Sequence, residues 1–176
     1  MLLQESRQKA REDGDGELVL LDQQDRTLWD RSLIAEGQAL VEAALRSGRA
    51  GVYTLQAAIA AVHGEASRPG ETDWAQIVAL YDALLRREPS PVIALNRAVA
   101  IAMRDGAAAG LLIVDELLGG PELAAYAPAH AARAELCRRL GRFGDARASF
   151  AAALDLATHG GTQRHLQRQI DRLETG

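Results

Sequence analysis

The stretch from Pro89 to Leu118, PSPVIALNRAVAIAMRDGAAAGLLIVDELL, predicts one helical hairpin with its own start, turn and stop. Ser90 can accept a hydrogen bond from an N–H of the first turn, and Pro91 at the first helical position loses no intrahelical bond. Gly106 can take the left-handed backbone conformation that ends a helix, and a Gly-Gly-Pro run follows the second helix. Because helices this short are marginal alone, each must bury an apolar stripe against a neighbour.

Both helices of this hairpin carry such a stripe, since apolar residues recur at spacings of three and four. In the first helix they are Val92, Leu95, Val99, Ala102 and Met103, and in the second Ala107, Leu111, Val114 and Leu118.

A later stretch has the spacing of a tetratricopeptide repeat, at Ala134, Gly141, Ala146, Phe150 and Ala153. In such a repeat, small residues let helices approach closely, and a large aromatic fills the contact with the next helix. The first hairpin fits the same frame, with Ala98, Gly110, Val114 and Leu117, and the two frames are offset by close to the period of about 34 residues. Trp74, Tyr81 and Pro89 fit an earlier unit.

The expected fold is therefore all-α: an array of antiparallel helical hairpins, a tetratricopeptide-like α-α superhelix of about three hairpins plus a C-terminal capping helix. Residues 1–12 read as the end of a helix, residues 13–16 as a turn and residues 17–21 as an extended segment. Residues 1–26 would precede one tetratricopeptide-like helical domain at 27–176. Its other helices are expected at about 28–47, 52–63, 74–87, 123–140, 143–157 and 162–173.

Two of these helices carry predictions that depend on single residues. Helix 28–47 should be capped by Asp25 or Thr27, and helix 74–87 by Thr72 or Asp73. The inward stripe of helix 28–47 is expected at Leu33, Ile34, Gly37, Leu40, Val41, Ala44 and Leu45. The aromatic residues Trp29, Tyr53, Trp74 and Tyr81 are expected in the core rather than on a recognition surface.

Charge and cysteine content narrow the function classes. The formal net charge is −4, so direct nucleic-acid binding is not expected. Arginine exceeds acid from Ala131 onward, which fits a solvated face or an anionic partner. Cys137 is the only cysteine, so no intrachain disulfide can form, and it is expected to be a small core residue. No apolar run approaches the length of a membrane span and no signal peptide is recognised, so a cytoplasmic location is expected.

No constellation points to catalysis. The four histidines do not show metal-ligand spacing with one another or with Cys137, and no Gly-rich phosphate loop or nucleophile motif is present. We expect neither an enzyme nor a cofactor. A helical enzyme domain stays a remote alternative, which a deep pocket with several perturbed ionisable groups would revive.

Four polar residues are candidates for contact with a partner protein. Gln56 and Asn96 each lie two residues before a small position of the repeat, so they could project from equivalent points of adjacent hairpins. An amide both donates and accepts, and could bond a peptide backbone or, alternatively, a loop of the same chain. Arg97 and Arg133 could add charge-assisted bonds to a carboxylate-bearing partner.

Five stretches carry a resemblance to a known protein group. They are DGELVLLDQQDRTLWDRSLIAEG, YTLQAAIAAVHGEA, TDWAQIVALYDALL, PSPVIALNRAVAIAM and LCRRLGRFGDARASFAAALDLA. In this order and with these gaps they resemble bacterial extracytoplasmic-function RNA polymerase sigma factors that carry a tetratricopeptide-like C-terminal extension. The regions that bind promoter and polymerase in that group, region 2 and region 4, are not in this chain, which looks like the extension alone.

The resemblance implies a regulatory protein-interaction domain. It would contact the sigma factor core or RNA polymerase and so modulate transcription initiation. The alternative is a free-standing tetratricopeptide-like adaptor that binds peptides.

Overall fold

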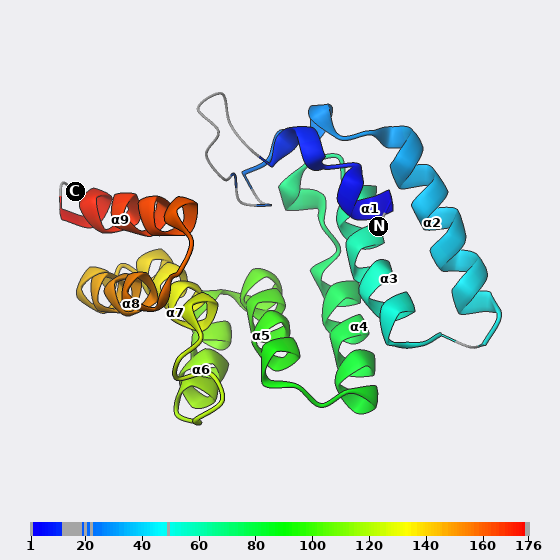
Figure 1. Cartoon of the computed structure of the whole chain (residues 1–176). Coiled ribbons are helices and arrows are strands. Elements are labelled where there is room, and N and C mark those ends of the chain that lie inside the picture. Colours follow the sequence, from blue (N-terminus) through cyan, green and yellow to red (C-terminus); the bar gives the residue numbers. More distant parts are fainter. Residues whose placement is uncertain (1, 12–18, 20, 22, 49, 175–176) are drawn as a thin grey trace. The chain divides into compact units, whose positions relative to one another are not determined.

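In the computed structural model, which describes residues 2–11, 19, 21, 23–48 and 50–174, the regular secondary structure is entirely helical (Figure 1). The expected all-α array of helical hairpins is confirmed. The chain divides into two compact units, Met1–Pro89 and Ser90–Gly176, each described by itself below. The expected boundary at residue 26 and the expectation of one domain stay predictions.

The first unit contains four α-helices among its described residues, with three short 3₁₀ turns between them. The α-helices are α1 (Leu2–Glu5), α2 (Arg31–Arg46), α3 (Val52–Glu65) and α4 (Trp74–Arg87). The 3₁₀ turns are η1 (Gln8–Ala10), η2 (Arg26–Leu28) and η3 (Pro69–Glu71). The single helix end expected at residues 1–12 is wrong, since Ser6 and Arg7 form a turn between α1 and η1. The extended segment expected at 17–21 lies mostly outside the described residues.

The core of the first unit joins α1, α2 and α3. Its buried members are Leu3, Ala10, Trp29, Ile34, Val41, Ala58 and Ala61. Gly37 lets α1 lie directly on α2, because a Cβ there would come within 2.7 Å of the Leu3 side chain. Trp29 is buried as expected.

Three residues expected inside the first unit are exposed instead. The buried stripe of α2, at Ile34, Gly37 and Val41, is narrower than expected, and Leu40 and Leu45 lie outside it at 59% and 41% exposure. Tyr53 was expected in the core but is 86% exposed, because it precedes the buried Leu55 by two positions and so falls on the other side of α3.

Aspartates cap α2 and α4 in the first unit. The Asp30 carboxylate accepts hydrogen bonds from the N–H groups of Ser32 and Leu33, so α2 starts at Arg31 rather than at Leu28 as expected. Of the two caps predicted for α4, Asp73 is confirmed, since it accepts from the N–H of Gln76 at 2.9 Å. Asp25, which was predicted with Thr27 as the cap of helix 28–47, instead caps η2.

The second unit consists of two antiparallel hairpins and a closing helix. Its helices are α5 (Pro91–Asp105), α6 (Ala107–Leu118), α7 (Ala127–Arg139), α8 (Phe143–Leu156) and α9 (Gly160–Glu174). The first hairpin, α5–α6, turns at Gly106, whose φ of 101° suits glycine. At Gly110 a Cβ would lie 2.4 Å from the Cβ of Ala102 and 2.7 Å from the carbonyl oxygen of Ala98. The predicted close approach at small residues is therefore confirmed.

The second hairpin and the closing helix share a core whose buried members are Ala134, Phe150, Ala153, Ala157, Leu166 and Ile170. Ala134 and Ala146 are fully buried, as their repeat positions predict. Cys137 is also fully buried and free, which confirms its expected core role, and burial raises the pKa of its thiol. The α9 helix covers α8 as the expected capping helix.

Three details of the second unit differ from the sequence prediction. The α7 helix begins at Ala127 rather than near Leu123, because Pro128 fits only in a first turn. Ser90 stands at the start of α5, but its side chain makes no capping hydrogen bond. Val92 lies at the first turn of α5, beside the stripe that Leu95 continues, and is 37% exposed.

Candidate interaction site

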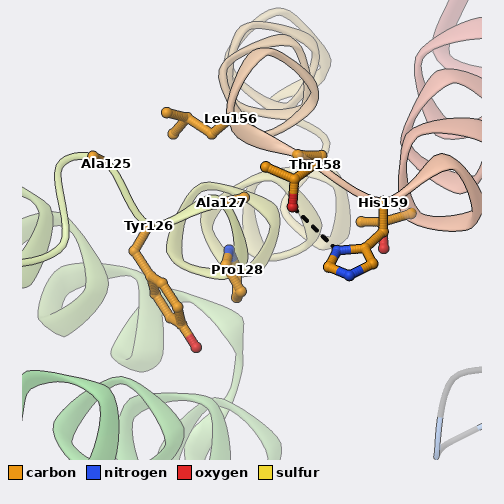
Figure 2. Close-up of a pocket in the computed structure, with 9 residues that line it drawn as sticks. Ala125, Tyr126, Ala127, Pro128, Leu156, Thr158 and His159 are labelled. Carbon is orange, nitrogen blue, oxygen red and sulfur yellow. Dashed lines mark hydrogen bonds between the residues drawn. The ribbon is translucent and has the colours of Figure 1, made fainter.

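A hollow of about 280 Å³ opens at one end of the second hairpin. It is lined by Ala125, Tyr126, Ala127, Pro128, Leu156, Ala157, Thr158, His159 and Thr162. Figure 2 shows the side chains of Thr158 and His159 beside the start of α7, joined by a hydrogen bond of 3.1 Å between Thr158 Oγ1 and His159 Nδ1.

The topology of the hairpin explains why these residues meet. The α7 and α8 helices are antiparallel neighbours, so the start of α7 and the end of α8 lie at the same end. Pro128 fixes where α7 begins, and the chain turns from α8 into α9 at residues 157–159. The α9 helix begins at Gly160 rather than at Thr162 as expected, so the Gly160-Gly161 pair belongs to its first turn. The Gln163 side chain then ties this turn, because its Nε2 donates to the carbonyl oxygen of Ala157 at 2.7 Å.

The lining combines a small apolar floor with hydroxyl and imidazole groups. Tyr126, Thr158, His159 and Thr162 can donate or accept hydrogen bonds, and neither carboxylate nor guanidinium side chains line the hollow. The volume falls just under the range of about 300–1,000 Å³ that is usual for small-molecule pockets. The hollow therefore suits one side chain or a short peptide segment better than a cofactor.

The predicted contact residues lie elsewhere. Gln56 on α3 and Asn96 on α5 are both exposed, and Arg97 is half-buried. Because Gln56 belongs to the first unit and Asn96 to the second, their predicted arrangement on adjacent hairpins stays a prediction. Within the second unit, Asn96 does not line the hollow.

Arg133 is tied within the second unit. Its Nε donates to Asp115 Oδ1 at 2.7 Å, and its Nη1 donates to the buried hydroxyl of Ser149 at 2.6 Å. The side chain thereby connects α6, α7 and α8. A partner's carboxylate would have to compete with Asp115 for this guanidinium, and contact with a partner stays a prediction.

Sequence reasoning missed the hollow, although the signals for it were present. Pro128 marked a helix start and Gly160-Gly161 marked a break. In an antiparallel hairpin, the turn before the first helix and the turn after the second lie at the same end. Combining those two signals would have placed Tyr126 near His159.

Within the described part of the chain, no group of three or more His, Cys, Asp or Glu side chains is arranged to hold a metal ion. None of the described helices has the length and apolar character needed to cross a membrane.

Part of the chain matches a known protein family, and nearly all of it matches an uncharacterized protein. Residues 1–45 match a family described as a family of unknown function (DUF6596). An uncharacterized protein of Rhizobium meliloti (strain 1021) is 46% identical over 173 residues, which is 98% of this chain and 40% of the relative. The chain thus spans about two fifths of the length of that relative. No solved structure matches the chain.

Proposed function

We propose that this chain is a regulatory protein-interaction region of a bacterial extracytoplasmic-function sigma factor. It would act in the cytoplasm by contacting the sigma factor core or RNA polymerase, and so would change transcription initiation. The observation that supports an interaction role is the hairpin architecture of the second unit, closely packed at Gly110 and open at the hollow beside Tyr126 and His159. The sigma factor context rests on the sequence resemblance.

The comparison with the Rhizobium meliloti protein is compatible with this proposal. Its match to the chain leaves three fifths of its length outside, which is room for further domains. In the proposed mechanism, docking of the helical region is coupled to the availability of the polymerase-binding surface. Such a coupling is reciprocal: if docking weakens polymerase binding, polymerase must weaken docking by the same factor.

The direct test uses the full-length protein that carries this region. Residues 1–176 are deleted, and transcription from a reporter and co-purification with RNA polymerase are measured. The proposal expects the deletion to change both. Unchanged reporter output and unchanged polymerase binding would contradict it.

A point variant tests the role of the hollow without removing the region. His159 is exposed, so His159→Ala should leave folding intact while weakening the docking contact. Gln167→Ala, at an exposed position farther along α9, is the matched control.

The alternative function, a free-standing adaptor, has a test of its own. Recovery of a partner protein in the absence of any sigma factor core would favour the adaptor.

A further inference from the structure

Two guanidinium groups converge on one neutral oxygen atom in the first unit. Arg7 Nη2 donates to Gln4 Oε1 at 2.6 Å, and Arg11 Nη2 donates to the same atom at 2.9 Å. Arg11 Nη2 also donates to the backbone oxygen of Gln4 at 3.0 Å. These hydrogen bonds lie at the exposed surface. An oxygen held by two guanidiniums is the usual place of a carboxylate or phosphate, whose charge strengthens each bond about twofold.

A third cation, Arg26, acts on Arg7, and the carboxylate of Glu71 acts in turn on Arg26. Arg26 is only 5% exposed, and its guanidinium donates to three neutral acceptors: the carbonyl oxygens of His63 and Ala66 and the hydroxyl of Thr72. Among the described residues, no carboxylate forms an ion pair with Arg7, Arg11 or Arg26. This cluster is notable in a chain whose formal net charge is −4.

The Trp29 ring positions two of these cations. The guanidinium carbon of Arg26 lies 4.9 Å from the ring centroid and that of Arg7 lies 5.7 Å from it, both within cation–π range. The Nε groups of Arg7 and Arg26 are buried without a hydrogen-bond partner. Burial and the nearby charges of Arg11 and Arg26 lower the pKa of Arg7. An anion nearby would relieve this repulsion between like charges.

We propose that Arg7 and Arg11 form a binding site for one oxyanion, a carboxylate or a phosphate group, that takes the place of the Gln4 amide oxygen. The Trp29 ring holds Arg7 in position. The site lies within the residues that match the family of unknown function, and it is independent of the hollow and of the proposed regulatory role.

The probes are inorganic phosphate and acetate, titrated by calorimetry into the whole chain at constant ionic strength. Saturable binding of one anion per chain is expected, and the two titrations distinguish the sources. Arg7→Gln and Arg11→Gln should each lower the affinity by about tenfold. Arg46→Gln is the matched control, because Arg46 lies on the exposed face of α2 beside Glu42.

Gln4→Glu provides an independent test that does not remove a cation. A carboxylate built in at this position should raise the melting temperature and abolish anion binding, because it occupies the site from within. The proposal is overturned if neither probe saturates, if Gln4→Glu still binds, or if Arg46→Gln loses binding as the Arg7 and Arg11 variants do.

Discussion

Different kinds of contact hold the helices together in the two units. In the second unit, helices meet through small, fully buried, neutral residues, as Gly110 does against Ala98 and Ala102. In the first unit, a buried guanidinium, Arg26, connects η2 to the end of α3, and Trp29 lies against it. Close packing at a glycine occurs in both units, at Gly37 and at Gly110, and the first unit adds the charged contact of Arg26. Added volume should therefore destabilise the contact at Gly110, and an added proton should destabilise the surroundings of Arg26.

Adding volume at Gly110 should have the largest effect. Gly110→Val places methyl groups where even a Cβ would be 2.4 Å from Ala102, so the free energy of unfolding should fall by about 3 kcal/mol. Urea unfolding followed by circular dichroism measures this loss. The control is Gly144→Val in α8, where a Cβ would meet nothing within 4 Å. Equal losses at the two glycines would contradict packing by shape.

This contrast shows what the sequence could predict. The helical spacing of small and apolar residues predicted the Gly110 contact and the capping role of α9, because packing by shape leaves a periodic record. Arg26 and Trp29 lie in short 3₁₀ and turn segments, where no periodicity exists. Their partners, including the carbonyl oxygen of His63, are set by tertiary structure alone.

Adding a proton to His63 should have the next largest effect. Burial, then the charges of Arg7 and Arg26, lower the pKa of His63 from 6.5 to about 4. Between these values the unfolded chain binds more protons than the folded chain. Stability is therefore full above about pH 6.5, falls as pH is lowered toward about 4, and depends no further on this group below that. A pKa difference of this size corresponds to at most about 3 kcal/mol, and solvent screening of the partly exposed ring lowers the expected loss to about 2 kcal/mol.

Urea unfolding at pH 7 and at pH 4 measures this effect, and His63→Phe is the informative variant. Phe keeps an aromatic ring beside Trp74, whose ring centroid lies 5.3 Å from that of His63, but it cannot be protonated. The variant should therefore lose less stability on acidification than the natural chain. An identical loss in both proteins would assign the acid sensitivity to other groups.

The helix caps give the smallest and most local difference between the units. The Asp30 side chain accepts hydrogen bonds from two N–H groups at the start of α2, whereas no side chain of the N-cap residue makes such a bond at the start of α5, α6, α7 or α8. In the second unit, Pro91 and Pro128 set the backbone of α5 and α7 instead. Asp30 and the two prolines each favour the start of a helix, but Asp30 does so through hydrogen bonds of its side chain.

Asp30→Ala should therefore cost about 1 kcal/mol of unfolding free energy, the usual worth of an N-cap. Ser90→Ala removes the residue that the sequence pattern named as a cap, yet it should cost much less, because the Ser90 hydroxyl bonds no N–H of α5. Urea unfolding of the two variants side by side measures the difference. A Ser90→Ala loss as large as that of Asp30→Ala would mean that Ser90 caps α5 in solution, and the contrast between the units would then be confined to their cores.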